Sequence, residues 1–171
     1  LKGSQDFTVS LAVVRDGRPV AAVVYGPMQD TLYSAIKGGG AMCDGVPMAV
    51  SDQDSIEGCR MLAAKVMFEH PAWPERWPRM DVTKINSVAY RLALVASGAY
   101  DATMAMSHRH DWDIAAGDLL VREAGGRMTA HDGSVLLYNR PRARQLSMLA
   151  AGPALHALLL KRVGRVPLPA V

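Results

Sequence analysis

The sequence has only two cysteines and no long uninterrupted apolar segment. Cys43 and Cys59 stand in no spacing typical of a metal site or a redox pair, and two cysteines do not form a disulfide framework. The apolar stretch 146–160 is too short to span a bilayer and is interrupted by Gly152-Pro153. No signal peptide opens the sequence. We therefore expect a cytoplasmic protein in a reducing environment, without membrane contact.

The sequence also has little excess charge of either sign. Its 171 residues carry 19 Lys and Arg against 16 Asp and Glu, a formal net charge of +3. This balance is compatible with a small anionic substrate, but it lacks the clustered basic face of a protein that binds a nucleic-acid polymer. Half of the residues are hydrophobic, which excludes disorder as the default. We expect residues 1–171 to form a single domain with a small-molecule partner, and a homodimer is left open.

Hydrophobic patterning predicts a mixed α/β (α+β) fold. Two β-branched segments joined by Asp16-Gly17 predict a hairpin. A helix is predicted over 87–97, and Pro153 suits the first turn of another. Strands are predicted at 7–14, 20–25, 31–36, 60–65, 102–106, 127–130 and 148–151. Because strands and helices alternate after Arg60, a layered arrangement is expected.

Two irregular segments invite functional interpretations. Residues 71–78 contain three prolines and cannot form a regular helix, and their tryptophans either pack onto the core or stack on a base. The glycines at 38–40 suggest a phosphate-binding loop, but the Gly-Lys-(Ser/Thr) ending and the following helix are missing. We interpret these glycines as a tight corner between strands.

The most informative stretch begins at Asp111 and ends at Gly126. Asp113 precedes an apolar series typical of a helical face, and two glycines predict the end of that helix. A carboxylate at this place can hold a hard cation through oxygen. The small residues 115–117 would let a phosphate or metal approach the backbone at the helix N-terminus. The alternative is that Asp113 only caps the helix.

This stretch resembles the C-terminal signature of the inositol monophosphatase superfamily. The match consists of Trp112, Asp113, Ala115, Ala116, Gly117 and Glu123 to Gly126, and segments 37–41 and 44–47 also resemble family motifs. The resemblance covers nearly the whole chain and implies the layered α/β sandwich of the sugar phosphatases. It implies an Mg²⁺-dependent phosphatase of inositol phosphates, 3′-phosphoadenosine nucleotides or fructose bisphosphate. By the same resemblance, Asp113 is a ligand of one Mg²⁺ ion.

The family's other signature, Asp-Pro-(Ile/Leu)-Asp-Gly-Thr, does not occur in the sequence. It would lie a few residues before Phe7, and in the family it supplies two further metal-binding carboxylates. We therefore expect the chain to be the C-terminal part of a longer enzyme, inactive alone, whose catalytic residues lie upstream of Leu1. The alternative, of a different class, is a non-catalytic fragment or structural partner.

Three residues are predicted to bind substrate. Ser87 and Arg91 fall four residues apart on one face of a helix start. In bisphosphate nucleotidases a Gly/Ser-rich turn and a Lys occupy this region, and Arg91 stands at the place of that Lys; the alternative is a surface arginine. Asp111 is interpreted as a substrate contact or as an exposed loop residue. His108 and His110 are expected on the substrate side or at the surface, because nothing nearby completes a zinc site.

The residues before the Trp-Asp motif bear on the substrate. The inositol-specific branch of the family carries a Glu there that contacts ring hydroxyls, but residues 104–107 contain no acid. The resemblance thus favours a 3′(2′),5′-bisphosphate nucleotidase-like enzyme acting on 3′-phosphoadenosine 5′-phosphate. Inositol-1-monophosphatase is the alternative.

Overall fold

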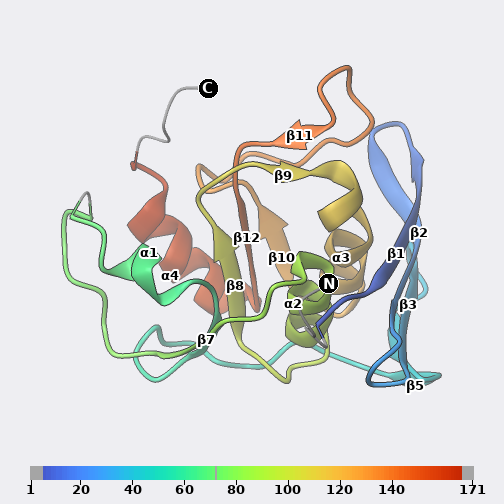
Figure 1. Ribbon diagram of the computed structural model, residues 1–171, viewed down its shortest axis with the longest axis horizontal. Helices are drawn as coiled ribbons and strands as arrows, with labels where there is room; N and C mark the ends of the chain where they lie inside the picture. Colours follow the sequence, from blue (N-terminus) through green and yellow to red (C-terminus); the bar gives the residue numbers. More distant parts are fainter. Residues whose placement is uncertain (1–5, 72, 167–171) are drawn as a thin grey trace.

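The computed structural model describes residues 6–71 and 73–166, which form alternating layers of sheet and helix (Figure 1). From right to left in that view lie a first sheet, a pair of helices, a second sheet and a further pair of helices. The helices are α1 (Lys65–Phe68), α2 (Val88–Ala96), α3 (Asp111–Glu123) and α4 (Pro153–Val163). The expected mixed α/β fold is confirmed.

The first sheet is an antiparallel meander in the order β1-β2-β3-β4-β5. Its strands are β1 (Val9–Arg15), β2 (Arg18–Gly26), β3 (Thr31–Ile36), β4 (Ala41–Cys43) and β5 (Val46–Pro47). The predicted Asp16-Gly17 hairpin is present, with positive φ angles of 52° and 72° at the two turn residues. Two-residue hairpins need such angles because they match the twist of the flanking strands.

The second sheet has the order β10-β12-β8-β6-β7 and a mixed strand direction. Its strands are β6 (Arg60–Leu62), β7 (Asp81–Thr83), β8 (Ala102–Ala105), β10 (Arg127–Thr129) and β12 (Met148–Ala151). A separate two-stranded sheet pairs β9 (Arg109–His110) with β11 (Arg144–Gln145). The strand predicted over 60–65 ends at Leu62, because the chain turns there into α1.

Both faces of the second sheet are covered. Along β12, Met148 and Ala150 pack in the core that contains α2 and α3, whereas Leu149 and Ala151 pack with α4. This alternation follows from the two-residue period of a strand. The predicted start of α4 at Pro153 is confirmed, and the stretch 146–160 is divided between β12 and α4. In the part of the chain that the structure describes, no helix has the length and apolarity needed to cross a membrane.

Close packing joins α2 to α3. A Cβ atom added to Gly117 would lie 2.4 Å from the Cβ of Leu92, far inside van der Waals contact. Ala115 and Ala116, like Gly117, are buried. The lack of a side chain at Gly117 therefore serves the contact with Leu92 of α2, and the access of a phosphate or metal to the backbone at 115–117 stays a prediction.

The glycine corner binds a carboxylate of α3. The backbone N–H of Gly38 donates to both carboxylate oxygens of Glu123 at 3.0 Å and 3.0 Å, and that of Gly40 donates to Oε2 at 3.1 Å. Both glycines have positive φ angles, 76° and 80°. The predicted tight corner is confirmed, and its anion-binding N–H groups are occupied by the protein's own side chain.

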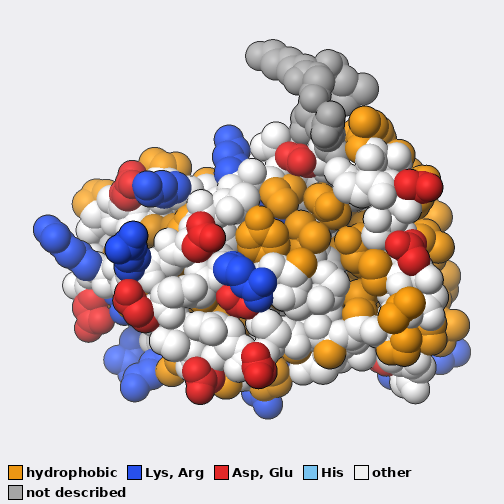
Figure 2. All heavy atoms as spheres, turned by 90° about the horizontal axis from the view of Figure 1, so that it is seen from below, with side chains coloured by type: hydrophobic (Ala, Val, Ile, Leu, Met, Phe, Trp, Pro, Cys, Tyr) orange, Lys and Arg blue, Asp and Glu red, His pale blue; other side chains and the backbone are white. Residues whose placement is uncertain are grey.

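The outer face of the first sheet is apolar and exposed. Leu11 pairs with Val23, and Val13 pairs with Ala21, which in turn pairs with Ile36. The side chains of Leu11, Val13 and Ile36 are 64%, 61% and 68% exposed. Figure 2 shows apolar side chains gathered at the right of the molecule, where this sheet lies in Figure 1. Within residues 6–71 and 73–166, the helices that contact this sheet do so from its other face.

We expect Gly117→Ala to destabilise the fold by about 1–3 kcal/mol, because the added methyl group overlaps Leu92. Alanine otherwise favours a helix over glycine by about 1 kcal/mol, so a loss identifies the clash. Thermal unfolding of the single variants Gly117→Ala and Leu92→Gly, and of the double variant Leu92→Gly/Gly117→Ala, which removes the Cβ at 92, provides the measurement. The double variant should be more stable than the sum of the single losses, and a stabilised Gly117→Ala protein would contradict the proposed contact.

We expect Glu123→Gln to lower the free energy of unfolding by about 1–2 kcal/mol, because charge-assisted hydrogen bonds to the glycine corner are lost. Urea unfolding measures the change. Glu69→Gln, at an exposed position on the C-terminal side of α1, removes the same charge and serves as the control. Equal losses in the two variants would show that net charge, and not the corner, causes the effect.

Candidate functional site

The N-terminal ends of α2 and α3 meet at a cavity of about 680 Å³. Ser87, Arg91 and Asp113 all line it, so the structure brings together three of the four residues that the sequence predicts. The free N–H groups at helix N-termini carry partial positive charge and favour anions. Two helix starts and an arginine therefore make this cavity suited to an anionic group.

Ser87 holds the start of α2. Its Oγ accepts a hydrogen bond from the backbone N–H of Tyr90 at 3.2 Å and lies 2.9 Å from the Oγ1 of Thr8. The first contact is the expected bond of an N-terminal capping residue. The second joins the helix start to the segment before β1. Ser87 thus shapes the wall of the cavity, and its substrate contact stays a prediction.

Arg91 is buried, with only 7% of its surface exposed. The alternative of a surface arginine is therefore wrong. Its Nε atom has no hydrogen-bond partner, and no ion pair forms with its guanidinium among the described residues. Burial, together with the nearby charge of Arg109, lowers the pKa of Arg91 to about 10. A bound anion would offset both effects.

Arg109 is a site residue that the sequence analysis missed. It lies in β9, lines the same cavity, and donates from Nη1 to the carbonyl oxygen of His108 at 2.7 Å and to Ser107 Oγ at 3.1 Å. Burial lowers its pKa, and the negative charge of Asp113 partly offsets that shift. The signal in the sequence is a basic residue four positions before Asp113, between two histidines.

Asp113 lies within the first turn of α3. The helix begins at Asp111, and its N-cap residue is His110, which forms no side-chain capping bond. The interpretation of Asp113 as the cap is therefore wrong. Its carboxylate is half-buried and takes part in no hydrogen bond or ion pair with the residues that the structure describes. An oxygen ligand in such a position fits a hard cation such as Mg²⁺.

The described residues do not by themselves form a metal site. Across residues 6–71 and 73–166, no group of three or more His, Cys, Asp or Glu side chains lies close enough together to hold a metal ion. Asp113 thus fits as one ligand among several. His108 and His110 line the cavity, and the ring of His110 stacks on Trp112 with centroids 4.1 Å apart.

Asp111 makes structural contacts, and its predicted substrate contact stays a prediction. It is buried, so the alternative of an exposed loop residue is also wrong. Its Oδ2 accepts from the backbone N–H of Asn139 at 2.8 Å, and its Oδ1 accepts from Gln145 Nε2 at 2.9 Å. Both oxygens therefore fix segment 139–145 against the start of α3. Asp111 lines a different cavity from Arg91 and Asp113.

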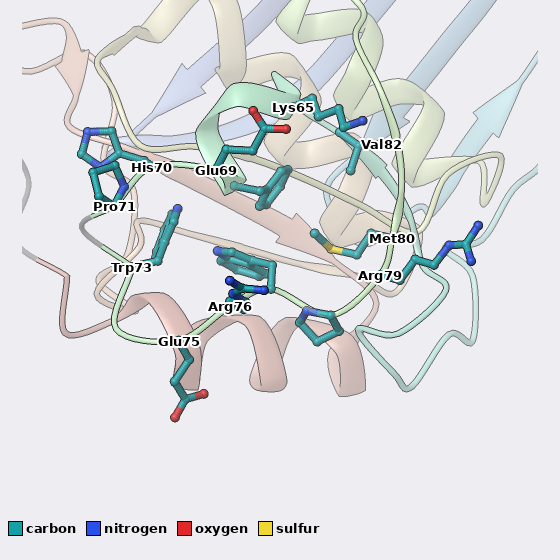
Figure 3. Close-up of a pocket in the computed structure, with 13 residues that line it drawn as sticks. Lys65, Glu69, His70, Pro71, Trp73, Glu75, Arg76, Arg79, Met80 and Val82 are labelled. Carbon is teal, nitrogen blue, oxygen red and sulfur yellow. The ribbon is translucent and has the colours of Figure 1, made fainter.

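A second large cavity, of about 720 Å³, lies beside segment 71–78 (Figure 3). The rings of Trp73 and Trp77 meet edge to face with centroids 5.0 Å apart, and Phe68 meets Trp77 at 5.0 Å. The guanidinium of Arg162 lies over the ring of Trp77, 4.7 Å from its centroid. The tryptophans thus pack against the core, as one of the two interpretations held, and the cavity contains none of the predicted site residues.

Comparison with known proteins identifies the family of this chain. Residues 1–167 match the inositol monophosphatase family. The Nus factor SuhB of Pasteurella multocida is 31% identical over 141 residues, which cover 78% of this chain and 52% of that protein. The chloroplastic phosphatase IMPL1 of Arabidopsis thaliana is 32% identical over 176 residues, covering 94% and 46%. The chain thus spans about half the length of these relatives.

Solved structures agree with the sequence matches. The extragenic suppressor protein suhB of Bartonella henselae superposes with a TM-score of 0.78 at 27% identity, covering 94% of this chain and 65% of that one. The inositol monophosphatase of Anabaena sp. PCC 7120 gives 0.77 at 26% identity, covering 96% and 66%. With its layered fold and the Trp112-Asp113 helix start, the chain belongs to the inositol monophosphatase family.

Proposed function

We propose that this chain forms the substrate-binding part of an Mg²⁺-dependent phosphomonoesterase. The observation that supports this most is that Arg91 and Asp113 line one cavity, a buried cation without an ion pair beside a carboxylate without a partner among the described residues. Family membership supports a phosphatase. Because this chain spans about half the length of its relatives, the activity is assigned to the longer enzyme, whose remaining metal ligands and water-orienting residues we expect outside these 171 residues.

Phosphate monoesters resist attack because the nucleophile and the ester are both negatively charged. Bound Mg²⁺ offsets that charge, activates a water molecule and stabilises the leaving oxygen. In this chain, Asp113 would hold one such ion through its carboxylate. The N-termini of α2 and α3 would bind the phosphate oxygens, and Arg91 would supply a positive charge from the buried wall of the cavity.

For the substrate we favour a bisphosphorylated nucleotide of the 3′-phosphoadenosine 5′-phosphate type. A buried arginine suits a second phosphate, since a guanidinium can form two parallel hydrogen bonds to it. The segment before Arg109 offers no acid to a polyol, and Met104 and Met106 present apolar side chains beside Arg91. Inositol 1-phosphate is the alternative substrate.

A second candidate function is non-catalytic. Several relatives are named as the Nus factor SuhB, a name that states no enzymatic activity. For this candidate the partner would be a macromolecule, and the expectation that no nucleic-acid polymer binds stays a prediction. A longer enzyme without Mg²⁺-dependent turnover on either proposed substrate would favour it.

In the longer enzyme, Asp113→Asn should reduce Mg²⁺-dependent kcat by roughly 100-fold or more, because a ligand of a charge-stabilising ion is lost. The fold should persist, with an unchanged thermal midpoint. Asp54→Asn, at an exposed position outside the cavity, removes the same charge and should keep full activity. Wild-type turnover in Asp113→Asn would end the assignment of Asp113 to the metal.

The longer enzyme should hydrolyse 3′-phosphoadenosine 5′-phosphate with a higher kcat/KM than inositol 1-phosphate. Arg91→Ala should lower that ratio by about 10-fold or more, the loss expected of a charge-assisted contact of about 1.5–3 kcal/mol. Steady-state kinetics on both substrates measure it. An equal or reversed preference in the wild type would favour inositol monophosphatase, and an unchanged ratio in Arg91→Ala would remove that residue from substrate recognition.

A further inference from the structure

We propose that Arg109 acts together with Arg91 as a two-guanidinium site for a second anionic group of the substrate. The inference rests on the proposed function and extends it to Arg109, which lies before the Trp112-Asp113 motif. It assigns the chemical class of the ligand: a small metabolite that carries another phosphate besides the one that is cleaved.

The two arginines stand on a shared wall between two cavities. One is the cavity that contains Asp113; the other, of about 400 Å³, is lined by Met67, Met104 and Met106. Both arginines line both cavities. A ligand whose reacting phosphate lies near Asp113 and whose remainder enters the second cavity would therefore pass between or beside the two guanidiniums.

Both side chains have a hydrogen-bond donor without an acceptor. The Nε atoms of Arg91 and Arg109 are buried, and neither has a partner among the described residues. A buried N–H group left unpaired costs free energy, and the cost is greater when the group is charged. An oxygen-rich anion is the ligand that supplies acceptors to two arginines at once.

Two other arginines, the half-buried Arg122 and the exposed Arg60, are paired with buried acids. Arg122 forms an ion pair with Asp118 at 2.5 Å, and Arg60 forms one with Asp101 at 2.6 Å. Arg91 and Arg109 lie close enough for the charge of one to lower the pKa of the other, and within the described ranges neither has an ion pair with an acid. The fold thus keeps two cations close together, and Asp113, the nearby acid that acts on Arg109, forms no ion pair with either among the described residues.

The surroundings fit a second phosphate better than a polyol. Arg91 and Arg109 share one cavity with Asp113, which is the acidic residue among its lining. The second cavity is lined also by Lys84, an exposed cation. The methionines beside the arginines are polarisable and apolar, and they offer few hydrogen bonds to hydroxyl groups. An organic phosphate with a flat base satisfies both the cations and the methionine side chains.

The test compares two probes that differ only in the second phosphate: adenosine 3′,5′-bisphosphate and adenosine 3′-monophosphate. Isothermal titration of the longer enzyme without added metal should give about 10-fold or more tighter binding of the bisphosphate, as charge-assisted contacts allow. Arg109→Gln, which keeps size and polarity, should reduce that ratio to about 2 or less, and Arg109→Lys should fall between them because a point charge replaces the planar fork.

Arg79→Ala is the matched control. Arg79 is an exposed arginine of the cavity in Figure 3, and its substitution lowers the net charge by the same amount as Arg109→Gln. The ratio of the two affinities should stay unchanged in this variant. Circular dichroism verifies that each variant is folded. Equal affinity of the wild type for the two probes, no binding of either, or an unchanged ratio in Arg109→Gln would overturn the proposal.

Kinetics in the longer enzyme separate this proposal from the proposed function. Arg109→Gln should raise KM for the bisphosphate more than for the monophosphate, whereas a merely structural loss would affect both alike. If Arg109→Gln turns over substrate and the ratio of its two KM values equals that of the wild type, the role of Arg109 is refuted and the proposed phosphatase activity stands. Selective loss of bisphosphate binding without turnover in any form would refute the phosphatase and keep the anion site.

Discussion

The contact between Leu92 and Gly117 sets the geometry on which the candidate site depends. Because a residue with any side chain at 117 would overlap Leu92, α2 and α3 can approach closely only with glycine there. Arg91 directly precedes Leu92, and Asp113 lies one helical turn before Gly117. The contact between Leu92 and Gly117 therefore determines the distance between Arg91 and Asp113, although neither of these two residues takes part in the contact.

The acidic residues of α3 divide structural and chemical tasks along one helix. Asp111 fixes a distant loop, and Glu123 fills the glycine corner. Asp118 is fully buried and bonds Tyr138 Oη and the neighbouring arginine; burial raises the pKa of its carboxyl group, and the arginine partly offsets the shift. Asp113 alone among the described acids of this helix has no such bond. A carboxylate without a protein partner is the one that can bind a ligand.

The sequence predicted local features well and long-range ones poorly. The Asp16-Gly17 hairpin and the start of α4 depend on residues that lie side by side, and both were correct. The burial of Asp111 depends on partners 28 and 34 residues away, which no local pattern reveals. Asp113 was identified by its place before an apolar helical series and by a family motif, and Arg109 was missed because Arg91, which lines the same cavity, lies 18 residues away in α2.

The exposed apolar face of the first sheet affects how unfolding responds to denaturant and heat. Both the denaturant m-value and the heat capacity change grow with the apolar surface that unfolding newly exposes. Leu11, Val13 and Ile36 already contact water in the folded chain, so they add little to either quantity. The unfolding of this chain should accordingly be shallower than its length suggests, and any surface that covered the face would steepen it.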